Sequence, residues 1–296
     1  AVYVRTAAEE EAVEGLARWL LSGGGGAHPP RRNFLFVLAH AADPALYPAN
    51  LLRNLALEPV ASLLVFLLDV DLIPDPGLYG YVMANMATLE GQAAHAVFLV
   101  PAFQGLGGFA ADESAFPTDK NEVVRMVQAK QLKPILSGEQ EFWPAASCVA
   151  YDTWYQADQP YAATYQWPCE PYLIGLTATM PLYDERFVHY GNDKAQHALN
   201  LFYLQYQFLV LPGHFLVHWA HALAAWADEG KRNAHMGEVL ELTEQFKFES
   251  GTEAGVNWHT GVKFAAGTYR VKNGVMIVWD GKQWIDQASG KPTDPL

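Results

Sequence analysis

The chain has 296 residues, of which 51% are hydrophobic and 17% are charged, and its formal net charge is −13. This composition excludes a disordered chain and is sufficient for one large core. The acidic charge argues against a nucleic-acid partner, which needs a basic surface, and no apolar run reaches the roughly 18–20 residues that cross a bilayer.

Strands and helices alternate along about the first 220 residues, which is typical of an α/β protein. Periodicity predicts strands at 1–5, 33–38, 61–68, 96–100, 172–177 and 208–211. It predicts helices from 6 to about 20, from Tyr47-Pro48 onward, and at 118–132, 194–206 and 222–246. The turn pairs Asn273-Gly274 and Asp280-Gly281 predict a small β-meander between about 262 and 287.

The most apolar predicted strand is 61–68, whose eight uninterrupted apolar or small residues indicate a central strand covered on both faces. The chain has only two cysteines, Cys148 and Cys169, so one disulfide is possible and a zinc–thiolate cage is not expected.

Two carboxylates follow this apolar run. On an extended segment, Asp69 and Asp71 would point to the same side, about 7 Å apart. The carboxyl ends of strands form the edge where α/β sheets bind ligands, and carboxylate oxygens suit Mg²⁺ or Mn²⁺ bridged to phosphate. The alternative is that both residues only cap a turn before Pro74. A buried strand that ends in two carboxylates favours the metal, because such groups need a cation or a basic partner.

His218 follows another apolar segment, near the end of the predicted α/β region. A histidine in such a place is more often a hydrogen-bonded core residue than a ligand. It becomes a metal-ligand candidate only if a metal site lies nearby.

Seven sequence blocks resemble, in the same order, the LARGE-type glycosyltransferases, which include β-1,4-glucuronyltransferase. The resemblance covers about residues 1–225. The blocks are YPANLLRNLAL (47–57), FLLDVDLIPDPGLYGYV (66–82), FLVPAF (98–103), FPTDKNEVVRMV (116–127), WPCEPYLI (167–174), YDERFVHYGNDK (183–194) and FLVLPGHFLVHWAH (208–221).

The resemblance implies a GT-A-like α/β fold, a Rossmann-like mixed sheet that binds a nucleotide sugar between flanking helices, with a small C-terminal β-meander. Residues 1–225 would form the glycosyltransferase domain, and 226–296 a helical extension plus the meander. The implied activity is inverting transfer of a glucuronate- or xylose-like sugar from a UDP-sugar to a glycan hydroxyl. The implied cofactor is Mn²⁺ or Mg²⁺, and the implied compartment is the Golgi or secretory lumen.

The resemblance also implies roles for residues whose positions match the family's motifs. Asp69 and Asp71 fall on its D-x-D, and His218 on its C-terminal metal-binding histidine. A further group is expected to line the donor site: Asn50, Arg53, Asn54 and Lys194.

Two carboxylates are candidates for the base that deprotonates the acceptor hydroxyl. Glu170, which with Tyr172 matches the family's E-P-Y, is the first, and Asp193 is the second. The alternative for Glu170 is a salt-bridged scaffold residue.

Two features depart from the family pattern. The family reads G-W-N-K or G-F-N-R where this chain has Gly191-Asn192-Asp193-Lys194, which leaves donor and acceptor specificity open. The family's first strand–helix unit has no counterpart here, so we expect another protein chain, or an N-terminal segment, to complete the sheet. The alternative functions are a catalytically degenerate domain that serves as a structural subunit, and a carbohydrate-binding module based on the nine tryptophans and fourteen tyrosines.

Overall fold

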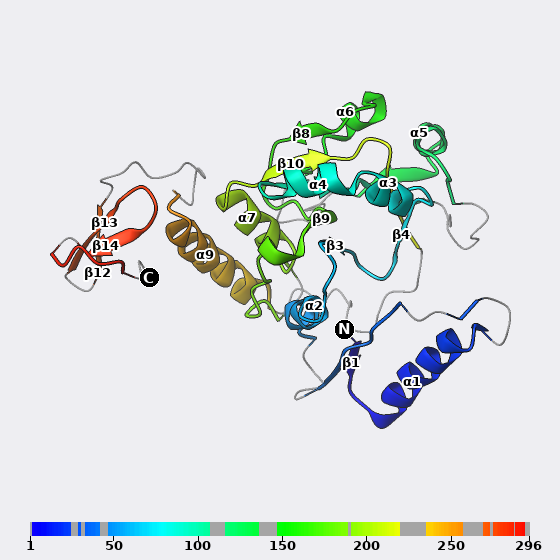
Figure 1. Ribbon diagram of the computed structural model, residues 1–296, viewed down its shortest axis with the longest axis horizontal. Helices are drawn as coiled ribbons and strands as arrows, with labels where there is room; N and C mark the ends of the chain where they lie inside the picture. Colours follow the sequence, from blue (N-terminus) through cyan, green and yellow to red (C-terminus); the bar gives the residue numbers. More distant parts are fainter. Residues whose placement is uncertain are drawn as a thin grey trace.

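The computed structural model spans residues 1–296. The part of the chain that the structure describes comprises residues 2–24, 29–30, 33–41, 47–106, 116–135, 147–188, 191–219, 235–256, 269–272, 275–286 and 288–293. Within these ranges the fold is the expected mixed α/β arrangement, consistent with a GT-A-like domain (Figure 1).

A mixed five-stranded sheet forms the centre of the molecule. Its strands lie in the order β3 (Leu64–Leu67), β9 (Leu173–Leu176), β5 (Ala96–Leu99), β10 (Gln207–Val210) and β8 (Tyr161–Ala163). β5 and β10 are parallel, whereas β9 runs antiparallel to both β3 and β5. The central position of β5 explains why all four of its residues are buried.

β3 is an edge strand of this sheet, and all four of its residues are only partly buried. The prediction of a central strand at 61–68 was therefore wrong in position, although a strand does form there. A second parallel pair of strands lies outside this sheet: β1 (Val2–Val4) pairs with β2 (Leu38–His40). The strand expected at 33–38 is thus displaced to 38–40.

After the end of β3 the chain enters a second, smaller sheet. Its strands lie in the order β4 (Leu72–Pro74), β11 (Leu216–His218), β6 (Ala102–Gly105) and β7 (Leu132–Pro134). In the antiparallel pairing of β4 with β11, Leu72 stands opposite His218. This register places the segment that follows β3 beside the end of β11.

The alternating residues of β5 divide the core into two layers. Val97 and Leu99 pack in a cluster with α5 (Lys120–Gln128), α6 (Tyr151–Gln156) and α7 (Ala195–Tyr203). Phe98 packs in a second cluster with α3 (Leu78–Ala84) and α4 (Met86–Ala93). Because successive side chains of a strand point to opposite faces, the sheet is covered by helices on both sides.

Local sequence signals set the remaining helix starts. Thr6 and Glu9 form a reciprocal capping box at the start of α1 (Ala7–Leu21), and the carboxylate of Asp119 caps α5. α2 (Ala49–Leu57) begins directly after Pro48. The short 3₁₀ helix η3 (Thr177–Thr179) follows β9.

The C-terminal part forms an extension beside α7. α9 (Met236–Glu253) packs against α7, and the antiparallel meander of β12 (Tyr269–Lys272), β13 (Val275–Trp279) and β14 (Trp284–Asp286) lies beyond it (Figure 1). The Trp284 indole donates to Thr252 O at 2.9 Å, which ties the meander to the end of α9. The turn pair Asn273-Gly274 lies outside the described residues.

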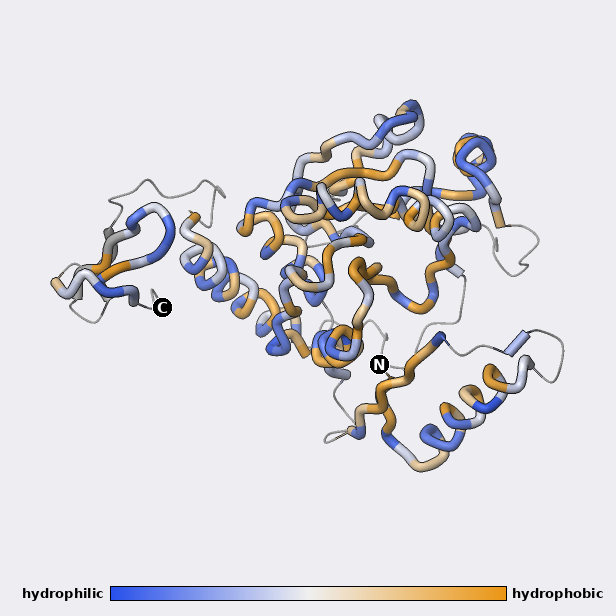
Figure 2. The backbone as a smooth tube through the Cα atoms, in the orientation of Figure 1, coloured by the Kyte–Doolittle hydropathy of each residue, from blue (hydrophilic) through white to orange (hydrophobic). Residues whose placement is uncertain are grey.

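Apolar residues are concentrated in the strands of the sheets, whereas α1 alternates between apolar and polar residues along its length (Figure 2). None of the helices in the described ranges combines the length and apolar composition needed to span a bilayer.

Candidate active site

The D-x-D segment lies in a turn between β3 and β4. The Leu72 backbone N–H donates to Asp69 O at 3.2 Å, so residues 69–72 are not extended. The expectation that Asp69 and Asp71 project to the same side of an extended strand was therefore wrong. Each carboxylate has its own partners, and Val70 between them is fully exposed.

Asp69 is held by basic and hydroxyl groups from three distant segments. Lys194 Nζ lies 2.6 Å from Asp69 Oδ2, and the Tyr172 hydroxyl donates to the same oxygen at 3.1 Å. Arg53 Nη2 lies 3.7 Å from Asp69 Oδ1. Burial acts to raise the pKa of Asp69, but the charge and hydrogen bond of Lys194, the charge of Arg53 and the hydrogen bond of Tyr172 together outweigh it, and the pKa is lowered. This carboxylate therefore stays ionised.

Each of the two candidate bases contacts a cation that also contacts Asp69. Glu170 Oε2 lies 3.6 Å from Lys194 Nζ, and the Arg53 Nη1 donates to Asp193 Oδ2 at 2.7 Å. Burial raises the pKa of Glu170, although the charge of Lys194 opposes this. A carboxyl group whose pKa is shifted toward neutrality is a better proton acceptor than an ordinary one.

Asp71 and His218 form the second half of the site. His218 Nε2 lies 3.2 Å from Asp71 Oδ2, and the Trp219 N–H donates to Asp71 O at 2.7 Å. A carboxylate and an imidazole this close are donor types that Mn²⁺ accepts. Asp69 is engaged by Lys194, and no group of three or more His, Cys, Asp or Glu side chains in the described ranges is placed to hold a metal. Of the three predicted metal ligands, the structure brings Asp71 and His218 into direct contact, whereas Asp69 is paired with Lys194.

Asn50 and Asn54 support the site and do not line its cavity. The Asn50 amide donates to Asp184 O at 2.8 Å, and its oxygen accepts from Arg53 Nη1 at 2.7 Å. Asn54 is buried and exchanges hydrogen bonds with both the backbone N–H and the backbone C=O of Tyr183. The polar face of α2 therefore fixes the 183–185 segment and aims the Arg53 guanidinium.

A cavity of about 250 Å³ opens beside Asp69. Apolar residues of α2 and β3 form one wall. The polar lining residues in the described part of the chain are Arg53, Asp69, Tyr172, Tyr183, Lys194 and His197. Such a cavity, apolar with a few convergent polar groups, is typical of a small-molecule site.

Sequence reasoning missed the roles of Tyr183 and His197. Their rings stack with centroids 4.1 Å apart, and the Arg53 guanidinium lies over the Tyr183 ring at 5.2 Å. Burial lowers the pKa of His197 to about 4, so the imidazole is neutral, and its Nε2 donates to Pro181 O at 2.9 Å. Tyr183 opens one of the seven blocks, which was the available signal.

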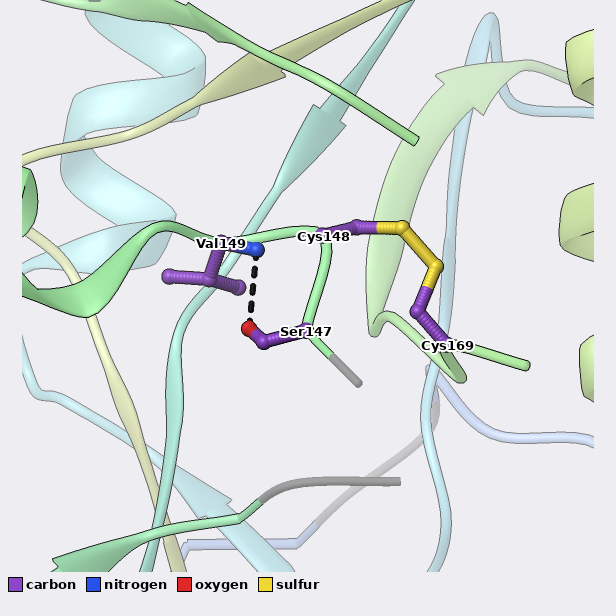
Figure 3. Close-up of a disulfide and its surroundings, with 4 residues drawn as sticks. All are labelled: Ser147, Cys148, Val149 and Cys169. Carbon is purple, nitrogen blue, oxygen red and sulfur yellow. Dashed lines mark hydrogen bonds between the residues drawn. A yellow bond between two sulfur atoms is a disulfide. The ribbon is translucent and has the colours of Figure 1, made fainter. Parts of the chain in front are cut away.

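A disulfide fixes the loop that carries Glu170. Cys148 and Cys169 are bonded and almost fully buried (Figure 3). Beside this bond the Ser147 hydroxyl accepts from the Val149 N–H at 3.0 Å. The disulfide that the two cysteines made possible is thus present, and it anchors Glu170 through its direct neighbour.

Comparison with known proteins identifies a family that this chain matches. Residues 30–247 match the protein family described as glycosyl-transferase for dystroglycan. The match ends within α9, beyond residue 225, where we expected the resemblance to stop.

Individual relatives are xylosyl- and glucuronyltransferases. LARGE2s of Gallus gallus is 34% identical over 218 residues, which cover 73% of this chain and 28% of the relative. LARGE2 of Mus musculus is 36% identical over 182 residues (61% of this chain, 25% of the relative). LARGE1 of Homo sapiens is 30% identical over 211 residues (71% and 27%). The matched part of the chain thus spans about a quarter of the length of these relatives. Because the family match covers most of the chain and includes every candidate site residue, this protein belongs to the LARGE-type glycosyltransferase family.

Proposed function

We propose that this chain transfers a sugar from a UDP-sugar to a hydroxyl group of a glycan, with inversion at the anomeric carbon and with a divalent cation. The observation that carries the proposal is the arrangement around the end of β3. There the cavity lined by Asp69, Tyr172 and Lys194 lies next to the turn whose other carboxylate, Asp71, pairs with His218.

Asp71 and His218 would hold Mn²⁺ or Mg²⁺, and Asp69 is the third residue that the D-x-D pattern assigns to it. When bound, the cation would neutralise the diphosphate and so make UDP a better leaving group. The remaining steps fall to side chains of this chain.

Arg53 and Lys194 are the cations that line the cavity in the described part of the chain. Both guanidinium and ammonium groups bind phosphate and hydroxyl oxygens, so we assign them to the donor. Asn50 holds Arg53 in place and Asn54 holds the adjoining 183–185 segment, so their contribution to donor binding is indirect.

Glu170 is our first choice for the base. Inversion requires the acceptor oxygen to lose its proton as it attacks the face of the anomeric carbon opposite to UDP. A partly buried carboxyl group with a raised pKa suits this task. Asp193, whose carboxylate is paired with Arg53, is the second choice.

Xylose and glucuronate are the two candidates for the transferred sugar, because the relatives are named for both. By the same likeness we assign the chain to the Golgi or secretory lumen. The buried Cys148–Cys169 disulfide supports an oxidising compartment of this kind.

A structural role without catalysis is the second candidate, and the edge position of β3 favours it. In the described residues this strand pairs only with β9, which leaves its other side available to a further strand from another chain or an N-terminal segment.

The deciding experiment measures UDP release from a panel of UDP-sugars, with and without Mn²⁺ and a glycan acceptor. Mn²⁺-dependent release from at least one donor supports the enzyme. No release from any donor by a folded sample, with or without acceptor, would contradict it.

A further inference from the structure

The segment directly before α7 has a backbone conformation that few residue types adopt. Gly191 and Asn192 have φ angles of 118° and 56°, both in the left-handed region. Asparagine tolerates this region better than most residues, but such a conformation persists only where the surrounding structure holds it. The Asn192 carbonyl also accepts from the Gln196 N–H at 3.0 Å, which begins the hydrogen-bond ladder of the helix. The conformation of Asn192 therefore sets where α7 starts.

Thr243 of α9 holds Asn192 in this conformation. Its hydroxyl accepts from Asn192 Nδ2 at 2.9 Å and donates to Val239 O at 2.7 Å. Asn192 is 6% exposed and Thr243 is 1% exposed, so water does not compete for this bond. Val239 lies against Gly191, since a Cβ at Gly191 would stand 3.5 Å from Val239 Cγ1. α9 thus contacts both of the left-handed residues.

The start of α7 carries side chains that line the cavity. Lys194 follows Asn192 by two residues, His197 lies three residues further along, and both line the cavity beside Asp69. The Lys194 ammonium lies 2.6 Å from Asp69 Oδ2, and its side chain is 22% exposed. A shift of the backbone at Asn192 would move the start of the helix and with it the Lys194 ammonium. The bond between α9 and Asn192 therefore contributes to the placement of this cation.

Resting on the proposed UDP-sugar function, we propose that Thr243 is a positioning residue of the donor site. By holding Asn192 it fixes the start of α7, and so the ammonium group of Lys194 that we assign to the donor. α9, which lies in the extension expected at 226–296, then serves donor binding in addition to packing against α7.

The test is calorimetric titration of UDP in the presence of Mn²⁺, with the stability of each variant measured by urea denaturation. Thr243→Val keeps the shape of the side chain and removes the hydroxyl, so the buried Asn192 amide loses this acceptor. The variant should weaken UDP binding by about 3–30-fold. Thr243→Ser retains the hydroxyl and should bind UDP as the unaltered protein does.

Leu242→Ala is the matched control on the same helix. Leu242 packs against the apolar cluster that includes Leu199 and Phe246. Its truncation should lower the urea midpoint, because it removes apolar contacts between α9 and α7. UDP affinity should stay unchanged, because the hydroxyl that holds Asn192 is still present.

Asn192→Gly is the second variant, and it gives the same comparison if Thr243→Val does not fold. Glycine adopts the left-handed φ without strain, so the change removes the amide and keeps the turn. It should weaken UDP binding as much as Thr243→Val does. The double variant should bind no more weakly than either single variant, because both changes remove the same hydrogen bond.

Unchanged UDP affinity in Thr243→Val, or an equal loss in Leu242→Ala, would overturn the positioning role and leave the proposed function standing. Additive losses in the double variant would show that Thr243 and Asn192 act separately, which would also overturn the inference. Failure of the unaltered protein to bind UDP with Mn²⁺ would overturn the proposed function and this inference together.

Discussion

Lys194 Nζ lies 2.6 Å from Asp69 Oδ2, although 125 residues separate them in the chain. Burial would lower the pKa of Lys194, but the surrounding tyrosine and carboxylates, Tyr172 first and Glu170 next, outweigh it, and the pKa is raised. The ammonium group is therefore permanently charged, and it connects the end of β3 with the start of α7.

Lys194→Met should lower the free energy of unfolding by about 1–3 kcal/mol, because it leaves carboxylates in a partly buried site without their cation. Urea denaturation measures the loss. The exposed Arg18 pairs with Glu14, so Arg18→Met is the control that removes a cation at little cost. In a Lys194→Met background, Asp69→Asn should then destabilise less than it does alone, and equal losses in both backgrounds would contradict the pairing.

Glu170→Gln should retain UDP binding and lose kcat by roughly 10²–10⁴, because the amide cannot accept the proton of the acceptor hydroxyl. Glu90→Gln, on the exposed face of α4, is the matched control and should keep full activity. Normal transfer by Glu170→Gln together with loss in Asp193→Asn would move the base to Asp193.

Asn54→Ala should reduce the free energy of unfolding by about 1–3 kcal/mol, because the backbone N–H and C=O of Tyr183 lose their hydrogen bonds to the Asn54 side chain. Asn85→Ala removes an amide that, among the described residues, bonds to Tyr81 O in its own helix region, and it should have the smaller effect in the same urea titration. A larger loss for Asn85→Ala would contradict the anchoring role of Asn54.

His197 should make the protein less stable in mild acid. Its pKa is about 4 in the folded chain, below the unfolded value of about 6.5, so the unfolded state binds the proton first. The stability that comes from the neutral imidazole is complete above pH 6.5 and is lost as the pH falls toward 4. The expected contribution is about 3 kcal/mol.

Unfolding free energies measured between pH 4 and 7 check this expectation. His197→Gln should show a shallower decline than the unaltered protein over that interval. Identical slopes would show that His197 is protonated as easily in the folded chain as in the unfolded one.

Periodicity predicted the elements whose type and position depend mainly on the local sequence. The run at 96–100 became the buried strand β5, and a helix formed within the predicted range 118–132. The run at 61–68 formed a strand, but its edge position could not be predicted. An uninterrupted apolar run looks the same whether neighbouring strands pair on one side or on both.

The sequence predicted which residues belong to the candidate site, but not how their side chains are arranged. The D-x-D pattern identified Asp69 and Asp71, yet the turn that separates their carboxylates depends on the Leu72–Asp69 hydrogen bond and on contacts across the fold. The ion pair with Lys194 and the anchoring by Asn54 join segments more than 120 residues apart. Local sequence carries no signal for such distant pairing.

Asp71 and His218 are proposed to hold a cation that binds the diphosphate, and Mn²⁺-dependent binding of UDP tests this role most directly. Calorimetry should show UDP binding when Mn²⁺ is present and little without it. Asp71→Asn and His218→Ala should each weaken this binding by ~10–100-fold. His235, paired with Glu238 on the surface, gives the matched control His235→Ala, which should bind normally. Equal UDP affinity with and without Mn²⁺, or an unchanged affinity in Asp71→Asn, would contradict this role of Asp71 and His218.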